Sequence, residues 1–392
     1  MSFLAGMAFL TGLTQLSRTE DDRLFEINVF VGSAVVLMGL GGFLVVQAAS
    51  ALGGAGSSPF LRRVPWLLLP LFPLALLSGQ VQANDPGRLP WAFPFVNLVV
   101  VGVPSLLIAS LAITRYTARN PIAWPVSWRE ATSGFTWGAI GATTFGGIVN
   151  TIAIYLGAAL VIDIAGRGDV FDISNIDTVS TGWGIAFDLG VLSVVAPFNE
   201  EFWKGSLVAL FFFRQGGLAR CFCWGVLAGT GFNLFETFLN SLAAVNPEQL
   251  ADQTIGGQWW LFAVARAGTC AIHGLASGFA ALGFYGLLRR RWTLAPLYFA
   301  GVALHGAWNG SAYLVSGDVF LSKAGPDAAW LDATGIGALV GLGSGSLLGL
   351  WLLSGWLRDG APAHLYRMLG MQPTETPAVH LPPYLLREAA GS

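Results

Sequence analysis

Charged residues are scarce in this 392-residue chain. Lysine, arginine, aspartate and glutamate together make up 11% of it, whereas about 25% is usual for a soluble domain. The net charge of −2 at pH 7 is too small to indicate nucleic acid or an acidic partner. Cysteine is scarce as well: Cys221, Cys223 and Cys270 form neither a disulfide framework nor the paired spacing of a zinc site. We therefore expect no disulfide-stapled scaffold and no nucleic-acid partner.

Long hydrophobic runs dominate what is present. Hydrophobic residues make up 54% of the chain, and the mean hydropathy is +0.63. Apolar blocks of about 20 residues recur, which is the length that a helix needs to cross a bilayer. We therefore predict an all-α, polytopic membrane protein with about nine transmembrane helices. The expected spans are residues 27–50, 64–80, 90–113, 135–162, 182–213, 219–241, 259–288, 293–315 and 333–357.

Basic and acidic residues alternate between the connections of these spans. Arginines occupy the connections at residues 62–63, 115–129, 214–220 and 289–291. Acidic residues occupy those at residues 163–177, 248–252 and 318–332. Because cytoplasmic loops are enriched in lysine and arginine, this pattern predicts a cytoplasmic C-terminus and an N-terminus outside. We expect an integral, multi-pass protein, in the plasma membrane of a bacterium.

Small residues recur at every fourth position in two of the spans. One series is Gly138, Ala142 and Gly146, and the other is Gly337, Gly341, Gly345 and Gly349. Such series let neighbouring helices approach closely in lipid. Both are expected to mark helix–helix contacts.

Polar side chains interrupt four consecutive spans. They are Glu200, Glu201, Lys204, Glu236, Arg266, His273, His305 and Asn309. One charge near the bilayer centre costs roughly 2.5–3.5 kcal/mol, so several unpaired charges would cost on the order of 10 kcal/mol, comparable with the whole stability of a domain. We therefore expect these side chains to face inward and to contact one another, with Arg266 paired to a carboxylate.

Helical spacing indicates how the charges in span 182–213 meet. Glu200 lies four residues before Lys204, and Glu201 lies three residues before it, so the lysine can reach either carboxylate. One ammonium cannot neutralise two buried carboxylates, and one of the two is then expected to share a proton or a cation. Such a carboxyl group suits a general base that activates water. A buried Glu–Lys strut is the structural alternative, and a lone histidine in a span is more often a hydrogen-bonded core residue. The set together favours a functional site.

The order of these residues resembles the PrsW family of intramembrane proteases, which is related to the CAAX prenyl proteases and to the APH subunit of gamma-secretase. The matching elements are Glu200-Glu201-x-x-Lys204, Phe232-x-x-x-Glu236, His273 and His305-x-x-x-Asn309. Their surroundings, GTGFNLFET, RAGTCAIHG and ALHGAWNG, are similar too. A CAAX-type enzyme would carry an arginine at the position of Gly205 and a histidine at that of Glu236. Both differences favour the PrsW branch.

The resemblance implies an intramembrane endopeptidase that cleaves a membrane-anchored protein substrate within the lipid bilayer. Glu200 or Glu201 would take a proton from water, with Lys204 holding the second glutamate. His305 and Asn309 would donate to the oxyanion, and His273 would orient the water or complete the oxyanion site. We prefer this glutamic mechanism, which needs no cofactor, to a zinc-dependent one. In the zinc alternative the candidate ligands are Glu200, Glu236, His273 and His305.

The apolar runs and the resemblance together divide the chain into five expected segments, of which the resemblance supplies the catalytic core. They are an interfacial segment (1–26), N-terminal transmembrane helices of unassigned role (27–165), the catalytic helical core (180–315), the last loop with the C-terminal transmembrane helix (316–357) and a cytoplasmic tail (358–392). Three other functions remain open from the residues. They are a non-catalytic membrane scaffold of the same fold, a proton-coupled transporter and a b-type haem protein with His273 and His305 as axial ligands.

Overall fold

The computed structural model describes residues 28–57, 60, 63–84, 92–117, 126–212, 217–243, 259–315 and 329–359. These residues fold into helices and the turns between them, with no β-strand among them. The all-α prediction is therefore confirmed. The predicted interfacial segment 1–26, most of the loop before the last span (316–328) and residues 360–392 of the predicted tail lie outside the described residues.

Seven helical runs among the described residues are long and apolar enough to cross a membrane. They are Phe30–Leu52, Phe93–Arg115, Trp128–Ala165, Thr181–Leu210, Leu218–Asn240, Trp259–Leu288 and Trp330–Leu357. The other two expected spans are helical as well. The first, α4 (Leu71–Asn84), has only 14 residues. The second, α13 (Pro296–Val315), has 20 residues but is less apolar, because it carries His305 and Asn309.

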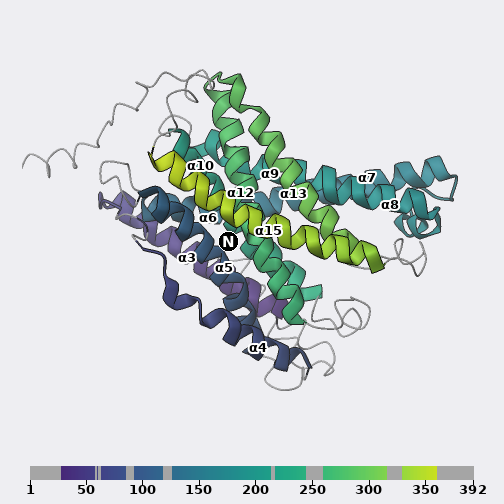
Figure 1. Cartoon of the computed structure of the whole chain (residues 1–392), viewed down its shortest axis with the longest axis horizontal. Coiled ribbons are helices and arrows are strands. Elements are labelled where there is room, and N and C mark those ends of the chain that lie inside the picture. The colour runs from purple at the N-terminus through teal and green to yellow at the C-terminus, as the bar shows by residue number, and fades with distance from the viewer. Residues whose placement is uncertain are drawn as a thin grey trace, which may run out of the picture.

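Two mostly buried helices, α10 (Leu218–Ala243) and α12 (Trp259–Leu288), form the centre of the bundle. Around them lie α5 (Phe93–Thr117), α9 (Ala196–Leu207), α13 and α15 (Ala329–Asp359), as Figure 1 shows. Glycine brings the central pair together. A methyl group at Gly225 would clash with the carbonyl oxygen of Ser277, and one at Gly229 with that of His273. The backbones therefore touch where α12 carries its histidine.

The first of the two small-residue series makes the predicted helix contact. Gly138 lies in the π-helical segment η5 (Trp137–Ala142), and a side chain there would clash with the Ala228 carbonyl on α10. The second series makes the predicted contact only at Gly349, where an added side chain would lie 2.9 Å from Leu275 Cδ2 on α12; for the other three glycines the prediction is wrong. A side chain at Gly337, Gly341 or Gly345 would meet no described atom within 4 Å, because these residues face away from the bundle.

A helical arm extends from the bundle. The arm begins with α6 (Trp128–Thr136), whose N-terminus is closed by a capping box between Ser127 and Glu130. After η5 comes α7 (Thr143–Ala165), which ends at Gly166 with φ of 62°. The chain then returns through α8 (Thr181–Gly190). Figure 1 shows α7 and α8 side by side, projecting away from the other helices.

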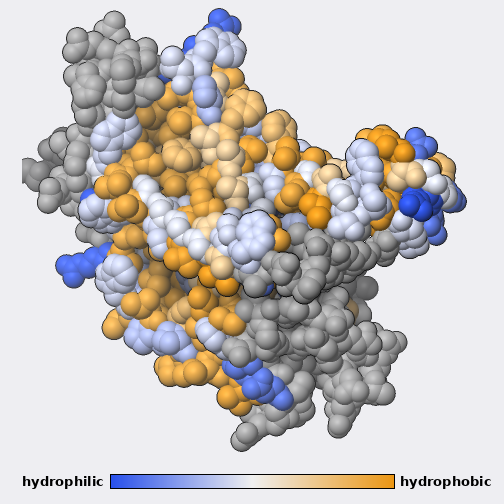
Figure 2. Space-filling view, turned by 45° about the vertical axis from the view of Figure 1, so that its right-hand side comes forward, coloured by the Kyte–Doolittle hydropathy of each residue, from blue (hydrophilic) through white to orange (hydrophobic). Residues whose placement is uncertain are grey.

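Apolar side chains cover the outside of this arm and of the bundle. Ile152, Leu156 and Leu160 on α7 are each more than half exposed, which fits a lipid environment better than water. Figure 2 shows hydrophobic residues over much of the drawn face, with hydrophilic residues near its edges. This surface agrees with an integral membrane protein.

A buried ion pair joins the arm to the central helices. It lies apart from the polar residues, Glu200 among them, that the sequence predicts to gather within the spans. Arg220 at the start of α10 donates to the carboxylate of Glu130 on α6. Both side chains are nearly buried, and Trp224 lies beside the guanidinium. The pair is a structural link, because neither residue contacts the glutamates of α9.

Candidate active site

Helix α9 carries the two adjacent glutamates and the lysine. It is preceded by the π-helical segment η7 (Val191–Val195) and followed by η8 (Val208–Phe212). Such π-helical turns are rare and are frequent at functional sites. Glu200, Glu201 and Lys204 are all buried. The turn spacing of the helix brings the lysine ammonium between the two carboxylates, 3.6 Å from Glu200 Oε2 and 2.8 Å from Glu201 Oε1.

Glu201 has every carboxylate oxygen engaged. Its Oε1 accepts from Lys204 Nζ at 2.8 Å and from His305 Nδ1 at 3.0 Å. Its Oε2 accepts from the Ser277 hydroxyl at 2.8 Å. The side chain is 0% exposed. A carboxylate held in this way by side chains from three helices is an anchor for its neighbours, because both of its oxygens already accept hydrogen bonds.

Glu200 differs from its neighbour. Its Oε1 accepts from Asn150 Nδ2 at 3.0 Å, whereas its Oε2 is buried and has no hydrogen-bond partner. Two groups face that oxygen beyond hydrogen-bonding distance, namely Lys204 Nζ at 3.6 Å and His305 Nε2 at 3.7 Å. A buried carboxylate oxygen without a donor is unusual, and each such group calls for an explanation.

His305 on α13 is oriented by Glu201. Because a carboxylate only accepts hydrogen bonds, the imidazole proton of a neutral His305 belongs on Nδ1. The Nε2 lone pair then points toward Glu200 Oε2, 3.7 Å away. The two acceptor atoms can both bind one water molecule that lies beside them. This is the one place among the described site residues where two open acceptors face each other.

His273 on α12 is held from both sides of its ring. Nε2 lies 2.9 Å from Glu236 Oε2, and Nδ1 lies 3.0 Å from Lys204 Nζ. Its ring packs edge-on against that of His305, with the centroids 4.5 Å apart. Arg266 donates to the same oxygen of Glu236 at 2.6 Å, so the expected pairing of Arg266 with a carboxylate is confirmed. The polar groups thus form one continuous network across α9, α10, α12 and α13.

Asn309 lies one turn beyond His305 but serves a different partner. Its Nδ2 donates to the carbonyl oxygen of Leu192 at 2.9 Å. Leu192 belongs to η7, where the wider π-helical turn changes the pairing of the backbone carbonyls. The structure therefore brings Glu200, Glu201, Lys204, Glu236, His273 and His305 into one network, whereas the amide of Asn309 bonds to the backbone beside it.

Several residues of this network escaped the sequence analysis. Asn150 on α7 donates to Glu200 and accepts from Asn199 Nδ2 at 2.8 Å. Ser277 donates to Glu201. Phe232 was identified in the motif Phe232-x-x-x-Glu236, but its contact was not: it lies under the lysine, with Nζ 3.9 Å from the ring centroid, so the ammonium gains a cation–π contact. Asn150 was detectable, because it is a polar residue inside an otherwise apolar span.

Three of the residues offer atoms that could hold a metal ion. Glu200, His273 and His305 each provide one potential ligand atom, and these atoms lie within 4.8 Å of one another. Glu236, the fourth candidate ligand, is instead engaged by Arg266 and His273. Carboxylate and imidazole are the ligand types of catalytic zinc sites. The fit of the arrangement to a metal depends on Lys204, whose Nζ lies 3.0 Å from His273 Nδ1 and 3.6 Å from Glu200 Oε2.

Comparison with known proteins gives one match. The model of a family described as PrsW family intramembrane metalloprotease matches residues 126–325. No curated protein and no solved structure matches the chain. The matched region begins at α6 and contains every residue of the buried polar network.

Proposed function

The chain belongs to the PrsW family of intramembrane metalloproteases, and from this premise we propose that Glu200 and His305 activate water to hydrolyse a peptide bond of a membrane-anchored protein. Family membership makes the protein an intramembrane peptidase. The proposal concerns its mechanism. The observation that carries it is the free Oε2 of Glu200, which faces the lone pair of His305 Nε2 at 3.7 Å.

The two open acceptors suit a water molecule that donates one hydrogen to each. Its oxygen lone pair is then free to attack a carbonyl carbon. As the C–O bond forms, Glu200 takes a proton from the water. The C–N bond breaks as Glu200 returns that proton to the leaving nitrogen, which yields a carboxylic acid and an amine; the acid then loses its proton to water. General base catalysis of this kind contributes on the order of a hundred- to ten-thousandfold in rate.

Glu201 and Lys204 position this pair without reacting. Glu201 fixes the ring of His305 through Nδ1, so that Nε2 stays turned toward the water. Lys204 supplies a positive charge 3.6 Å from Glu200 Oε2. In a buried site, where charges are weakly screened, this ammonium is the cation nearest to a developing oxyanion. His273, which Glu236 holds through Nε2, contacts the ammonium through Nδ1.

The residues match a zinc site in type but not in arrangement. His273 Nε2 carries the proton that it donates to Glu236, and its one ring lone pair, on Nδ1, accepts from Lys204, so no lone pair is free for a metal. A dication bound by Glu200 and His305 would also lie beside the lysine ammonium, which repels it. We therefore propose a glutamate-activated, metal-free site, in which Lys204 provides the positive charge that a metal supplies in other hydrolases.

The test is cleavage of membrane-tethered reporters by the purified protein in liposomes. Wild type should cut. Glu200→Ala and His305→Ala should reduce the rate by a hundredfold or more, as expected for loss of a general base, and Glu236→Ala should weaken it by releasing His273. Asp188→Ala is the matched control, because Asp188 lies in the same helical run but contacts Tyr313. If the three variants cut like wild type, the assignment of the site is wrong. If the wild type itself does not cut, a non-catalytic scaffold becomes the better interpretation.

A further inference from the structure

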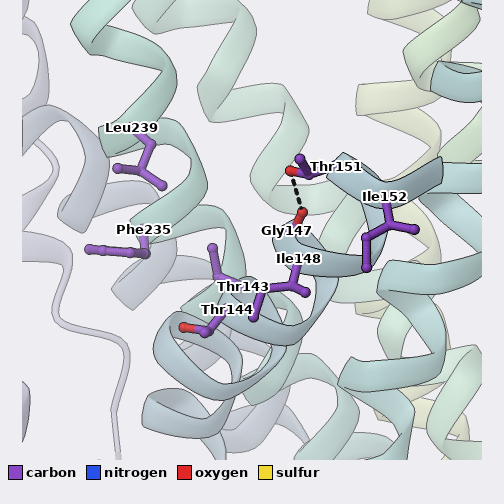
Figure 3. A pocket seen from close by; sticks show the side chains of 8 residues that line it. All are labelled: Thr143, Thr144, Gly147, Ile148, Thr151, Ile152, Phe235 and Leu239. Atoms are coloured by element: carbon purple, nitrogen blue, oxygen red, sulfur yellow. Dashed lines mark hydrogen bonds between the residues drawn. The ribbon is translucent and has the colours of Figure 1, made fainter. Parts of the chain in front are cut away.

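A groove opens between α7 and α10 on the lipid-facing side of the molecule. It is lined by Thr143, Thr144, Gly147, Ile148, Thr151, Ile152, Phe235 and Leu239 and has a volume of about 500 Å³. In Figure 3 the residues of α7 form one wall, and Phe235 and Leu239 on α10 form the other. The groove exists because α7 diverges from the bundle and leaves the side of α10 uncovered.

The walls of this groove are apolar in effect, although three threonines contribute to them. The Thr151 hydroxyl donates to the Gly147 carbonyl at 2.8 Å, as Figure 3 shows, and the Thr143 hydroxyl donates to the Gly138 carbonyl at 3.0 Å. These two hydroxyls are satisfied within their own helical run. No ionisable residue lines the groove. An occupant therefore needs no charge and no polar side chain.

Small residues form a flat strip along the α7 wall. Thr143, Gly147 and Thr151 recur at every fourth position, so they lie on one face of the helix. A side chain added at Gly147 would meet no described atom within 4 Å. Strips of small and hydroxyl-bearing residues are the surfaces that transmembrane helices use for close packing in lipid. This strip has no partner helix among the described residues.

The groove adjoins the catalytic network. Gly146, the residue next to Gly147, lies at the inner side of the wall, where an added methyl group would be 3.6 Å from Glu200 Cγ and 3.9 Å from the Phe232 ring. Asn150, one turn further along the same helix, binds Glu200 Oε1. On α10, Phe235 is followed directly by Glu236. The two walls therefore lead from the lipid to the candidate base.

We propose that this groove is the docking site for the substrate's transmembrane helix, and that it selects helices with small residues at every fourth position. The inference rests on the proposed function and adds a substrate class to it. A segment arriving from lipid is helical, because its backbone groups must be satisfied internally. The uncharged walls fit an apolar helix, and the flat strip around Gly147 fits a partner whose own face is flat.

The first experiment fills the groove. Gly147→Phe places a ring in open space, so the fold is retained while the docking helix is displaced. A displacement of about 1 Å is enough to cost on the order of a hundredfold in rate. Gly341→Phe is the matched control, because Gly341 faces equally open space on α15, away from the groove. We expect cleavage to fall a hundredfold in Gly147→Phe and to stay at the wild-type rate in Gly341→Phe. Equal cleavage by the two variants would overturn the docking site.

The second experiment detects docking without cleavage. A photo-crosslinking residue replaces Ile148 in the groove, or Val340 on α15 as the control, in full-length Glu200→Ala protein. The probes are two single-pass reporters of leucine-rich helices, one with glycine or alanine at every fourth position and one with leucine there. We expect a crosslink from position 148 to the first reporter, a weaker one to the second, and none from position 340.

The outcomes separate this inference from the proposed function. Equal crosslinks from both positions, or adducts with lipid alone at position 148, would overturn the docking site even if wild type cleaves the reporter. A specific crosslink at position 148 together with a wild-type protein that cleaves neither reporter would retain the docking site and refute the catalytic proposal.

Discussion

Replacing Glu200 and Glu201 by glutamine, one at a time, should separate activity from stability. The substitution is the same, and the two residues are adjacent, yet their surroundings differ. Glu201 accepts three hydrogen bonds in full burial, two of them from Lys204 and His305. Glu200 keeps one oxygen for Asn150 and leaves the other without a donor.

The expected magnitudes follow from these contacts. In Glu201→Gln the buried Lys204 ammonium loses its closest carboxylate, and breaking a buried ion pair costs about 3–5 kcal/mol. In Glu200→Gln the amide oxygen still accepts from Asn150, so the stability should change by no more than about 1 kcal/mol, the value of one ordinary hydrogen bond. Cleavage should nevertheless fall by a factor on the order of a hundred to ten thousand, because the general base is gone.

The assay is reversible unfolding in mixed detergent micelles, combined with reporter cleavage by the same preparations. A double variant, Glu201→Gln with Lys204→Met, removes both charges and should recover part of the lost stability, because no unpaired ion remains. If Glu200→Gln were the destabilised variant, or if it still cleaved at the wild-type rate, the division of roles between the two glutamates would be refuted.

Two further variants probe the framework around the site. In Gly229→Ala a methyl group would clash with the carbonyl of His273, so α10 and α12 must separate. Cleavage should fall on the order of a hundredfold through misplacement alone, whereas Gly341→Ala on the open face of α15 should cleave normally; normal cleavage by Gly229→Ala would contradict the tight contact. Glu130→Ala leaves Arg220 buried without its carboxylate, which should cost about 3–5 kcal/mol of stability. Cleavage per folded molecule should stay unchanged in that variant, and a lower rate would show that the pair also supports the site.

Much of the fold follows from the sequence because lipid imposes simple rules. Apolar runs of spanning length must be helical, and the runs around Phe93, Leu218 and Trp259 are helices in the structure. The divergence of α7 from the bundle could not be predicted in the same way. Its apolar residues satisfy the same rule whether they face lipid or a neighbouring helix.

The contacts within α9 could be predicted from the sequence for a similar reason. A spacing of three or four residues places Glu200 and Glu201 beside Lys204 whatever the rest of the fold does. Contacts between helices carry no such spacing. The donation of Ser277 to Glu201, and of Asn150 to Glu200, depends on how α12 and α7 are rotated. Only the presence of Asn150 in an apolar span could have drawn attention to it.

Asn309 illustrates a local limit of the sequence. Its position four residues after His305 predicts a side chain on the same face, directed at the site. The carbonyl of Leu192 takes the amide instead, because η7 is a π-helical turn. The residues Val191–Val195 carry no sequence signal for a π-helical turn. The extra residue that such a turn takes in changes which backbone carbonyl is left without a backbone donor.

The most direct test of the central claim is hydrolysis by the metal-free protein in water labelled with oxygen-18. The purified protein is treated with a chelator, its zinc content is measured, and the new C-terminus of the cleaved reporter is analysed by mass spectrometry. The account predicts cleavage with one labelled oxygen at the new carboxylate while zinc is absent, and no labelled product from Glu200→Gln. Product that forms only after zinc is restored in stoichiometric amount would contradict it.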